Sequence, residues 1–290
     1  MNDDTATDTA TDTATDTATD TATDTATETE AGAGRDAGAG ALALRPLTAR
    51  SIVLSTLLGH HPPRLPARAL VRVGELFGIA EGTVRVALSR MVAAGDLLQR
   101  DGSYGLTARL LARQTRQDAS RSPRTRPWGG GRGEEWEIAV VATAERRPAA
   151  ERTALRQAMA DLRLAELREG SWLRPANLDR PRPAVATEQC TWFTGTPDGD
   201  PAALVRRLWD LDGWAERARA LLAALDRAGT PADRFTIAAA VLRHLLADPL
   251  LPGGLLPPDW PGDALRLRYA AFETELRELL RQFVEPGPTR

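Results

Sequence analysis

Residues 66–107 decide the fold of the amino-terminal half of the chain: PARALVRVGELFGIAEGTVRVALSRMVAAGDLLQRDGSYGLT. Apolar residues recur at helical spacing on both sides of Gly78, which predicts two helices joined by a short turn. Asp101 and Gly102 then separate two short β-type runs, the signal of a two-stranded hairpin. With a further helix in front, capped by Thr48, the pattern predicts a winged helix-turn-helix.

The helix after the turn is expected over residues 81–94 and has two different faces. Its core face carries Val84, Leu88, Met91 and Val92. The opposite face carries small or hydrogen-bonding side chains, which suit a helix that enters the ~12 Å major groove of DNA. We predict DNA contacts for Thr83, Arg85, Val86, Ser89 and Arg90. The alternative interpretation of this face is an ordinary solvated helix surface.

The hairpin supplies two more candidates, Arg100 and Ser103. Both are placed to contact phosphate or the minor groove, and phosphate contacts add affinity without sequence information. The alternative for Arg100 is a solvated hairpin arginine.

The charge is distributed unevenly along the chain, although the net charge of the 290 residues is only −2. Residues 1–40 have a net charge of −9, residues 41–133 of +10, and residues 134–290 of −3. A strongly basic block is typical of nucleic-acid binding, but basic modules also bind membranes and acidic proteins.

The composition excludes several classes of enzyme. All 37 basic side chains are arginine, which excludes the phosphate-binding loop that needs a lysine and excludes lysine Schiff-base chemistry. Cys190 is the single cysteine, so a disulfide within the chain and a cysteine-based zinc site are excluded. The three histidines form no HExxH motif. We therefore expect no cofactor and no metal.

The order of patterns predicts an α+β multidomain protein. Five segments are expected: a disordered acidic Thr/Ala/Asp tail (1–45), a winged-helix domain (46–112), a polar linker (113–133), a ferredoxin-like α+β domain (134–200) and a helical domain (201–290). The tail has no apolar signal-peptide core, and no apolar run is long enough to span a membrane. We expect a cytoplasmic protein that does not insert into membranes.

The ferredoxin-like prediction depends on a strand that begins at Trp136, a helix opened by Pro148, and short β-type pieces at 164–168, 171–174 and 190–193. Three helices are expected in residues 201–284, with a proline-rich turn between the last two.

The last of these helices has an apolar seam with alternating spacings of four and three residues. The seam consists of Leu265, Tyr269, Phe272, Leu276, Leu279 and Phe283. Its partner is either the helix bundle of the same subunit or the second subunit of a dimer. For His244 and for the tryptophans and prolines of this region, packing is favoured over ligand binding.

Three separated stretches resemble the phenylacetate-responsive PaaX-type transcriptional regulators. They are residues 66–100, the stretch LRLAELREGSWLRP (162–175), and WDLDGWAERA (209–218) together with LRHLLADPLLPGGLLPPDWPG (242–262). The resemblance spans residues 47–284. It implies a homodimeric bacterial repressor that binds an inverted-repeat operator in double-stranded DNA and is released by an aryl-CoA thioester or a related metabolite.

Two positions depart from the family pattern. Ala80 stands where the family usually has a small polar residue before the recognition helix, unless Thr83 caps the helix one turn later. Glycines also interrupt the segment before Trp136. Both departures affect how the recognition helix is positioned relative to DNA.

An acyl-CoA effector needs cations for its phosphates and a flat apolar slot for its acyl ring. Trp136, Trp172, Arg174 and Trp192 are the candidate effector-binding residues.

Two other functions stay open. The ferredoxin-like unit resembles a nuclease family associated with CRISPR systems, and a metal-dependent nuclease would need an acidic ligand near the end of the first strand, where Glu145 stands. The second is a DNA-binding adaptor without an effector. Because no hydrolase motif is present, we expect no enzyme.

Overall fold

The computed structural model describes residues 42, 44, 47–128, 134–142 and 148–284. Three features expected from the sequence lie outside these residues: the acidic repeat, the glycine-rich segment 129–133 and Glu145.

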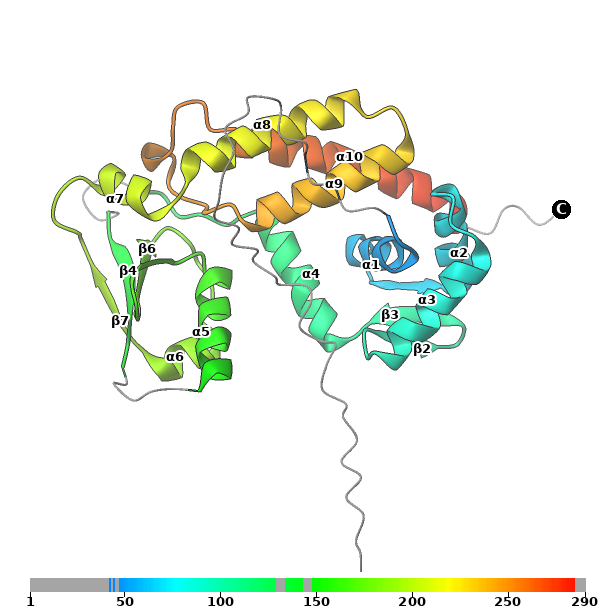
Figure 1. The fold of residues 1–290 in the computed structure, drawn as a ribbon, viewed down its shortest axis with the longest axis horizontal. Coiled ribbons are helices and arrows are strands. Elements are labelled where there is room, and N and C mark those ends of the chain that lie inside the picture. Colours follow the sequence, from blue (N-terminus) through cyan, green and yellow to red (C-terminus); the bar gives the residue numbers. More distant parts are fainter. Residues whose placement is uncertain (1–41, 43, 45–46, 129–133, 143–147, 285–290) are drawn as a thin grey trace, which may run out of the picture. The chain divides into compact units, whose positions relative to one another are not determined.

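The amino-terminal part begins with three helices and three short strands (Figure 1). They are α1 Ala49–Gly59, β1 Arg64–Pro66, α2 Ala67–Leu76, α3 Glu81–Ala93, β2 Leu97–Arg100 and β3 Ser103–Leu106. Thr48 caps α1 as predicted, because its Oγ1 accepts from Ser51 N at 3.1 Å. The helices and the hairpin confirm the expected order. Strand β1 was not expected; it pairs antiparallel with β3, so that the sheet order is β1-β3-β2.

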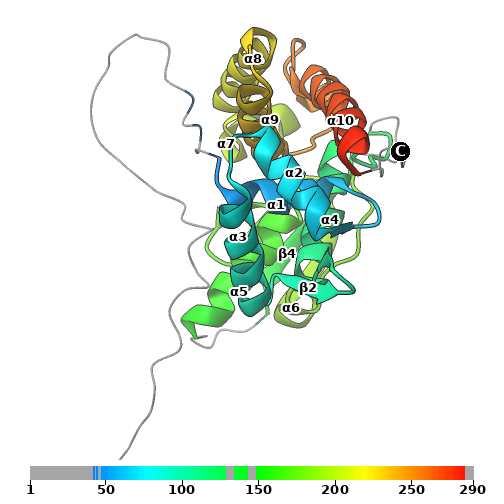
Figure 2. The ribbon, with the colours of Figure 1, turned by 90° about the vertical axis from the view of Figure 1, so that its right-hand side faces the viewer.

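Helices α2 and α3 pack closely against each other (Figure 2). The contact is closest at Gly74, where a Cβ atom would lie 2.4 Å from Cγ2 of Val84. The turn between the helices needs Gly78, whose φ of +75° falls in the left-handed region that favours glycine. Only a residue without a side chain at position 74 therefore lets the two helices approach this closely.

Helix α4 spans Ala108–Arg121 and occupies the first part of the segment expected to be a linker. Its buried side chains after Leu110 are Gln114, Gln117 and Ser120. The amide of Gln114 donates to the carbonyl oxygens of Leu58 and His60, at 2.8 and 3.2 Å. The prediction of a linker was wrong here because the buried face of α4 is mostly polar, and an apolar pattern does not reveal it.

The middle part contains a four-stranded antiparallel sheet and two helices. Its elements are β4 Trp136–Val141, α5 Ala149–Asp161, β5 Ala165–Arg168, β6 Ser171–Pro175, α6 Ala184–Gln189 and β7 Cys190–Gly195. The strand order is β5-β6-β4-β7. The predicted strands are confirmed, and α6 is an addition. Both helices share a core with Ala139 and Trp172, which places them on one face of the sheet.

The carboxy-terminal part has four α-helices and one short 3₁₀ helix among its described residues. They are α7 Pro201–Leu208, α8 Leu211–Arg227, α9 Pro231–Leu246, η1 Gly253–Leu255 and α10 Gly262–Val284. The sequence predicted three helices, and the first of these is in fact two. Asp210 separates them, because its carboxylate accepts from Gly213 N at 2.9 Å and caps α8.

His244 is packed, as predicted, in an aromatic stack at the centre of these helices. Its ring stacks on Trp214 with centroids 4.3 Å apart, and Trp214 stacks on Trp260 at 4.4 Å. Nε2 of His244 lies 2.9 Å from the carbonyl oxygen of Trp214. Burial lowers the pKa of His244.

The apolar seam of α10 packs within the same subunit along the part whose side chains are described. Leu265 and Tyr269 are buried in the core of the carboxy-terminal helices. Further along, Phe272 and Leu276 pack against a small cluster that contains Ile52 and Phe235. Of the two partners left open by the sequence, the helices of the chain itself occupy this part of the seam.

Candidate nucleic-acid interface

Helix α3 exposes the face predicted to contact DNA. Val84, Leu88 and Met91 are buried against the amino-terminal core. The five predicted contact residues are exposed: Thr83, Arg85, Val86, Ser89 and Arg90. Because the core takes up the apolar stripe, the structure brings these five side chains together on one open surface.

Packing within the protein does not explain why two side chains of this surface are exposed. Val86 is 50% exposed although it is an apolar β-branched residue. Arg90 is exposed and forms no ion pair with any residue that the structure describes. An apolar group and a free guanidinium one helical turn apart match the two kinds of contact that base edges offer, a thymine methyl group and the guanine O6/N7 pair.

Arg85 differs from Arg90 because it is already paired. Its Nε donates to Oε1 of Glu81 at 2.7 Å, and its Nη2 lies 2.6 Å from the same oxygen. Ser89 Oγ donates to the carbonyl oxygen of Arg85 at 3.1 Å. Neither Ala80 nor Thr83 caps α3 with a side chain, so that Glu81 is the stabilising group in its first turn.

The hairpin of β2 and β3 ends in a two-residue turn. Asp101 and Gly102 have φ values of +49° and +67°, as a type I′ turn requires. Arg100 and Ser103 pair directly across the ladder next to this turn. Arg64 holds the turn, because its Nη2 donates to the carbonyl oxygen of Arg100 at 2.9 Å. Arg64 was missed by the sequence analysis, since β1 is too short for an alternating pattern.

A buried carboxylate fixes the end of α3 to its neighbours. Asp96 is almost completely buried, and its Oδ2 lies 2.9 Å from Nη2 of Arg50 in α1. Its other oxygen accepts from Arg109 in α4. The carboxylate therefore ties the end of α3 to helices α1 and α4. It was also missed by the sequence analysis.

The four predicted effector residues do not form one site. Trp136 is fully buried in a cluster with Leu173 and Leu211. Trp172 lies in the cluster on the other face, below α5 and α6. Trp192 packs beside that second cluster, and its Nε1 donates to the carbonyl oxygen of Ala186 at 3.0 Å.

Two arginines that the sequence analysis missed, Arg180 and Arg182, surround Glu137 together with Arg174. Distances from its carboxylate oxygens are 3.7 Å to Arg174, 3.3 Å to Arg180 and 3.6 Å to Arg182. Cζ of Arg182 lies 3.8 Å from the centroid of the Trp192 ring. Burial lowers the pKa of Arg180 to about 10, although Glu137 opposes the shift. Three cations therefore share one carboxylate beside an aromatic face.

Comparisons with known proteins identify the family of the chain. A family model described as PaaX-like protein matches residues 48–110, and one described as PaaX-like protein C-terminal domain matches residues 209–286. A solved structure, the uncharacterized protein Rv0674 from Mycobacterium tuberculosis, is 45% identical, with a TM-score of 0.70 over 81% of this chain and 98% of that chain. The chain belongs to the PaaX-like protein family. PaaX-like proteins are generally transcriptional regulators and typically not enzymes.

A search of curated proteins found no match. Among the described residues, no helix of this PaaX-like protein is long and apolar enough to cross a membrane, and no three potential ligands cluster for a metal ion. Glu145, the residue on which a nuclease would depend, lies outside the described part.

Two of the PaaX-like stretches meet at Arg174. Its guanidinium is fully buried and donates to the carbonyl oxygens of Arg163, Pro175, Pro249 and Leu250 and to Oδ1 of Asn177. Two of these carbonyl groups belong to the non-glycine residues with left-handed backbone in this region, Arg163 (φ 57°) and Leu250 (φ 52°). Arg174 thus holds two strained turns, and its five N–H donors are in use.

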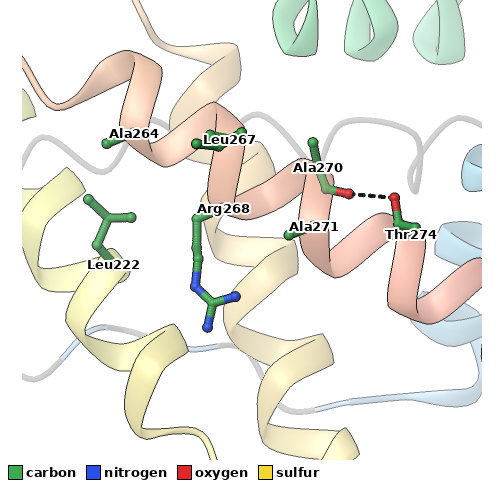
Figure 3. Close-up of a pocket in the computed structure, with 7 residues that line it drawn as sticks. All are labelled: Leu222, Ala264, Leu267, Arg268, Ala270, Ala271 and Thr274. Atoms are coloured by element: carbon green, nitrogen blue, oxygen red, sulfur yellow. Dashed lines mark hydrogen bonds between the residues drawn. The ribbon is translucent and has the colours of Figure 1, made fainter.

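An open hollow of about 430 Å³ lies on the carboxy-terminal helices (Figure 3). Leu222 of α8 faces α10 across it, and most of its lining is apolar. The residues of α10 that line it are Ala264, Leu267, Arg268, Ala270, Ala271 and Thr274. None of the predicted effector residues lies here.

Proposed function

We propose that this PaaX-like protein is a sequence-specific regulator of transcription that binds double-stranded DNA through α3. The observation that carries the proposal is the exposed face of α3, which follows a glycine turn and precedes a two-stranded hairpin. This arrangement is that of a winged helix-turn-helix, in which the second helix of the motif enters the major groove. The protein acts in the cytoplasm, where the DNA is.

Each residue has a role that follows from its chemistry. Arg90 donates two hydrogen bonds to O6 and N7 of a guanine, while Thr83 and Val86 contact thymine methyl groups. Arg85 and Ser89 complete the surface that faces the bases. Arg100 and Ser103 bind phosphate beside the groove and contribute affinity without sequence information.

The proposed active form is a homodimer that acts as a repressor. Two recognition helices related by a twofold axis bind half-sites about one DNA turn apart, ~34 Å, on an inverted repeat. We assign the effector to the middle part, which has the strand order of a ferredoxin-like domain. An aryl-CoA thioester or a related metabolite favours a dimer geometry that no longer fits the operator, and a coupling of about 1–3 kcal/mol suffices.

Of the four effector candidates, the geometry favours Trp192. Its ring is partly exposed and lies against the guanidinium of Arg182, which shares Glu137 with Arg180. An aromatic face and cations are therefore offered to an anionic aromatic ligand. Trp172 lies behind it in the shared core, whereas Trp136 and Arg174 are fully buried and support the site by holding the sheet.

Selection from a library of random DNA duplexes tests the proposed function. The full-length protein is expected to enrich an inverted repeat whose half-site centres lie about 10 base pairs apart. Enrichment of no sequence contradicts it.

A thermal-shift screen of acyl-CoA thioesters separates a ligand-responsive regulator from a DNA-binding adaptor. A ligand that binds the folded protein raises its melting temperature. The same compound must then weaken binding to the selected duplex, and an adaptor shows neither effect.

A further inference from the structure

Glu81 stands at the amino-terminal tip of the recognition surface. It is the first residue of α3 and the acidic residue of that helix, and about half of its side chain is exposed. Both contacts with Arg85 use Oε1, at 2.7 Å to Nε and 2.6 Å to Nη2. Oε2 makes no bond to a described residue, so that it stays available as an acceptor.

An acidic group is unusual at this place, because DNA carries one negative charge per ~1.7 Å of helix axis. Near phosphates a carboxylate repels the DNA, and it also neutralises Arg85. At a base edge the situation is reversed, because a glutamate accepts a hydrogen bond from the N4 amino group of cytosine. Glu81 therefore weakens DNA binding that depends on phosphate contacts and favours DNA binding that depends on contacts with base edges.

We propose that Glu81 is a specificity-determining residue. It holds Arg85 in position for a base edge, accepts from a cytosine amino group through Oε2, and weakens binding that depends on phosphate contacts alone. This inference rests on the proposed function. The competing interpretation is a helix-stabilising pair with no role in recognition, in which Glu81 serves only the first turn of α3.

The full-length variant Glu81→Gln tests the proposal, with Glu75→Gln as the matched control. Glu75 is an exposed residue of α2, so that its substitution makes the same change of charge in the same part of the chain. Each protein is titrated with a random-sequence duplex of 30 base pairs and with the duplex that the wild-type protein enriches. Circular dichroism and thermal unfolding establish that the variants are folded.

We expect Glu81→Gln to bind the random duplex about 5- to 10-fold more tightly than the wild-type protein at low salt, while its affinity for the enriched duplex does not rise. The release of Arg85 for phosphate contact makes the slope of log affinity against log salt for the random duplex steeper by about one. Selection with the variant loses a preference for C·G at one position of each half-site. The control Glu75→Gln leaves the ratio of the two affinities unchanged.

Two results overturn the proposal. One is an unchanged ratio of the two affinities in Glu81→Gln. The other is a parallel loss of both affinities together with a lower unfolding temperature, which shows that Glu81 only stabilises the helix. A wild-type protein that enriches no duplex contradicts the proposed function instead, and this is seen without the variant.

Discussion

At the scale of single residues, Arg174 and Arg90 show how differently one residue type is used. Arg174 is fully buried and donates to four backbone carbonyl groups, whereas Arg90 is exposed and pairs with no described residue. The sequence pattern predicted the exposure of Arg90 because helical periodicity separates two faces. It could not predict the partners of Arg174, since Pro249 and Leu250 lie far along the chain.

We expect Arg174→Lys to destabilise the protein by about 2–4 kcal/mol. A lysine cannot reach four carbonyl groups in different directions, so that buried acceptors lose their donors. Urea unfolding of the full chain measures the change. Arg182→Lys, at a partly exposed guanidinium, is the control and should cost less than about 1 kcal/mol. Equal stability of Arg174→Lys and the wild-type protein would show that the hydrogen bonds of Arg174 do not stabilise the fold.

At the scale of elements, apolar periodicity revealed the helices that bury an apolar stripe and missed those that do not. Helix α3 was predicted with its two faces because Val84, Leu88 and Met91 repeat at helical spacing. Helix α4 was missed because Gln114, Gln117 and Ser120 form most of its buried side. Helices α2 and α3 approach closely because Gly74 has no Cβ atom. A sequence pattern of apolar side chains does not reveal such a contact.

Substitution of Gly74 by alanine should destabilise the protein by about 1–3 kcal/mol. The new Cβ would lie 2.4 Å from Cγ2 of Val84, so that α2 and α3 must separate. Gly82→Ala is the control, since a Cβ there meets nothing within 4 Å and alanine favours the helix. Thermal unfolding compares the two variants. Similar melting temperatures would mean that the close approach of the helices is not needed.

At the scale of the whole molecule, the distribution of charge matters more than the total. Residues 41–133 carry a net charge of +10, and residues 1–40 carry −9. The acidic segment lies outside the described residues, and from its charge we predict that it competes with DNA for the basic block. Salt screens such attraction beyond about 8–10 Å.

Replacement of every Asp and Glu in residues 1–40 by Asn and Gln tests this competition in the full-length protein. We expect the neutral variant to bind a random duplex about threefold more tightly or better at low salt, because a tethered competitor acts at a high local concentration. The difference should vanish at about 0.5 M salt. Equal affinities at low salt would show that the acidic segment does not compete with DNA.

The most direct test of the central claim is the affinity of Arg90→Ala for the enriched duplex, measured by fluorescence anisotropy. The account predicts a loss of about 10- to 100-fold, with a smaller loss on a random duplex and a relaxed base preference, because one guanidinium contacts a guanine edge. Arg207→Ala, an exposed arginine of α7, is the control and should bind as the wild-type protein does. Unchanged affinity of Arg90→Ala for the enriched duplex would contradict the assignment of α3 as the helix that recognises DNA.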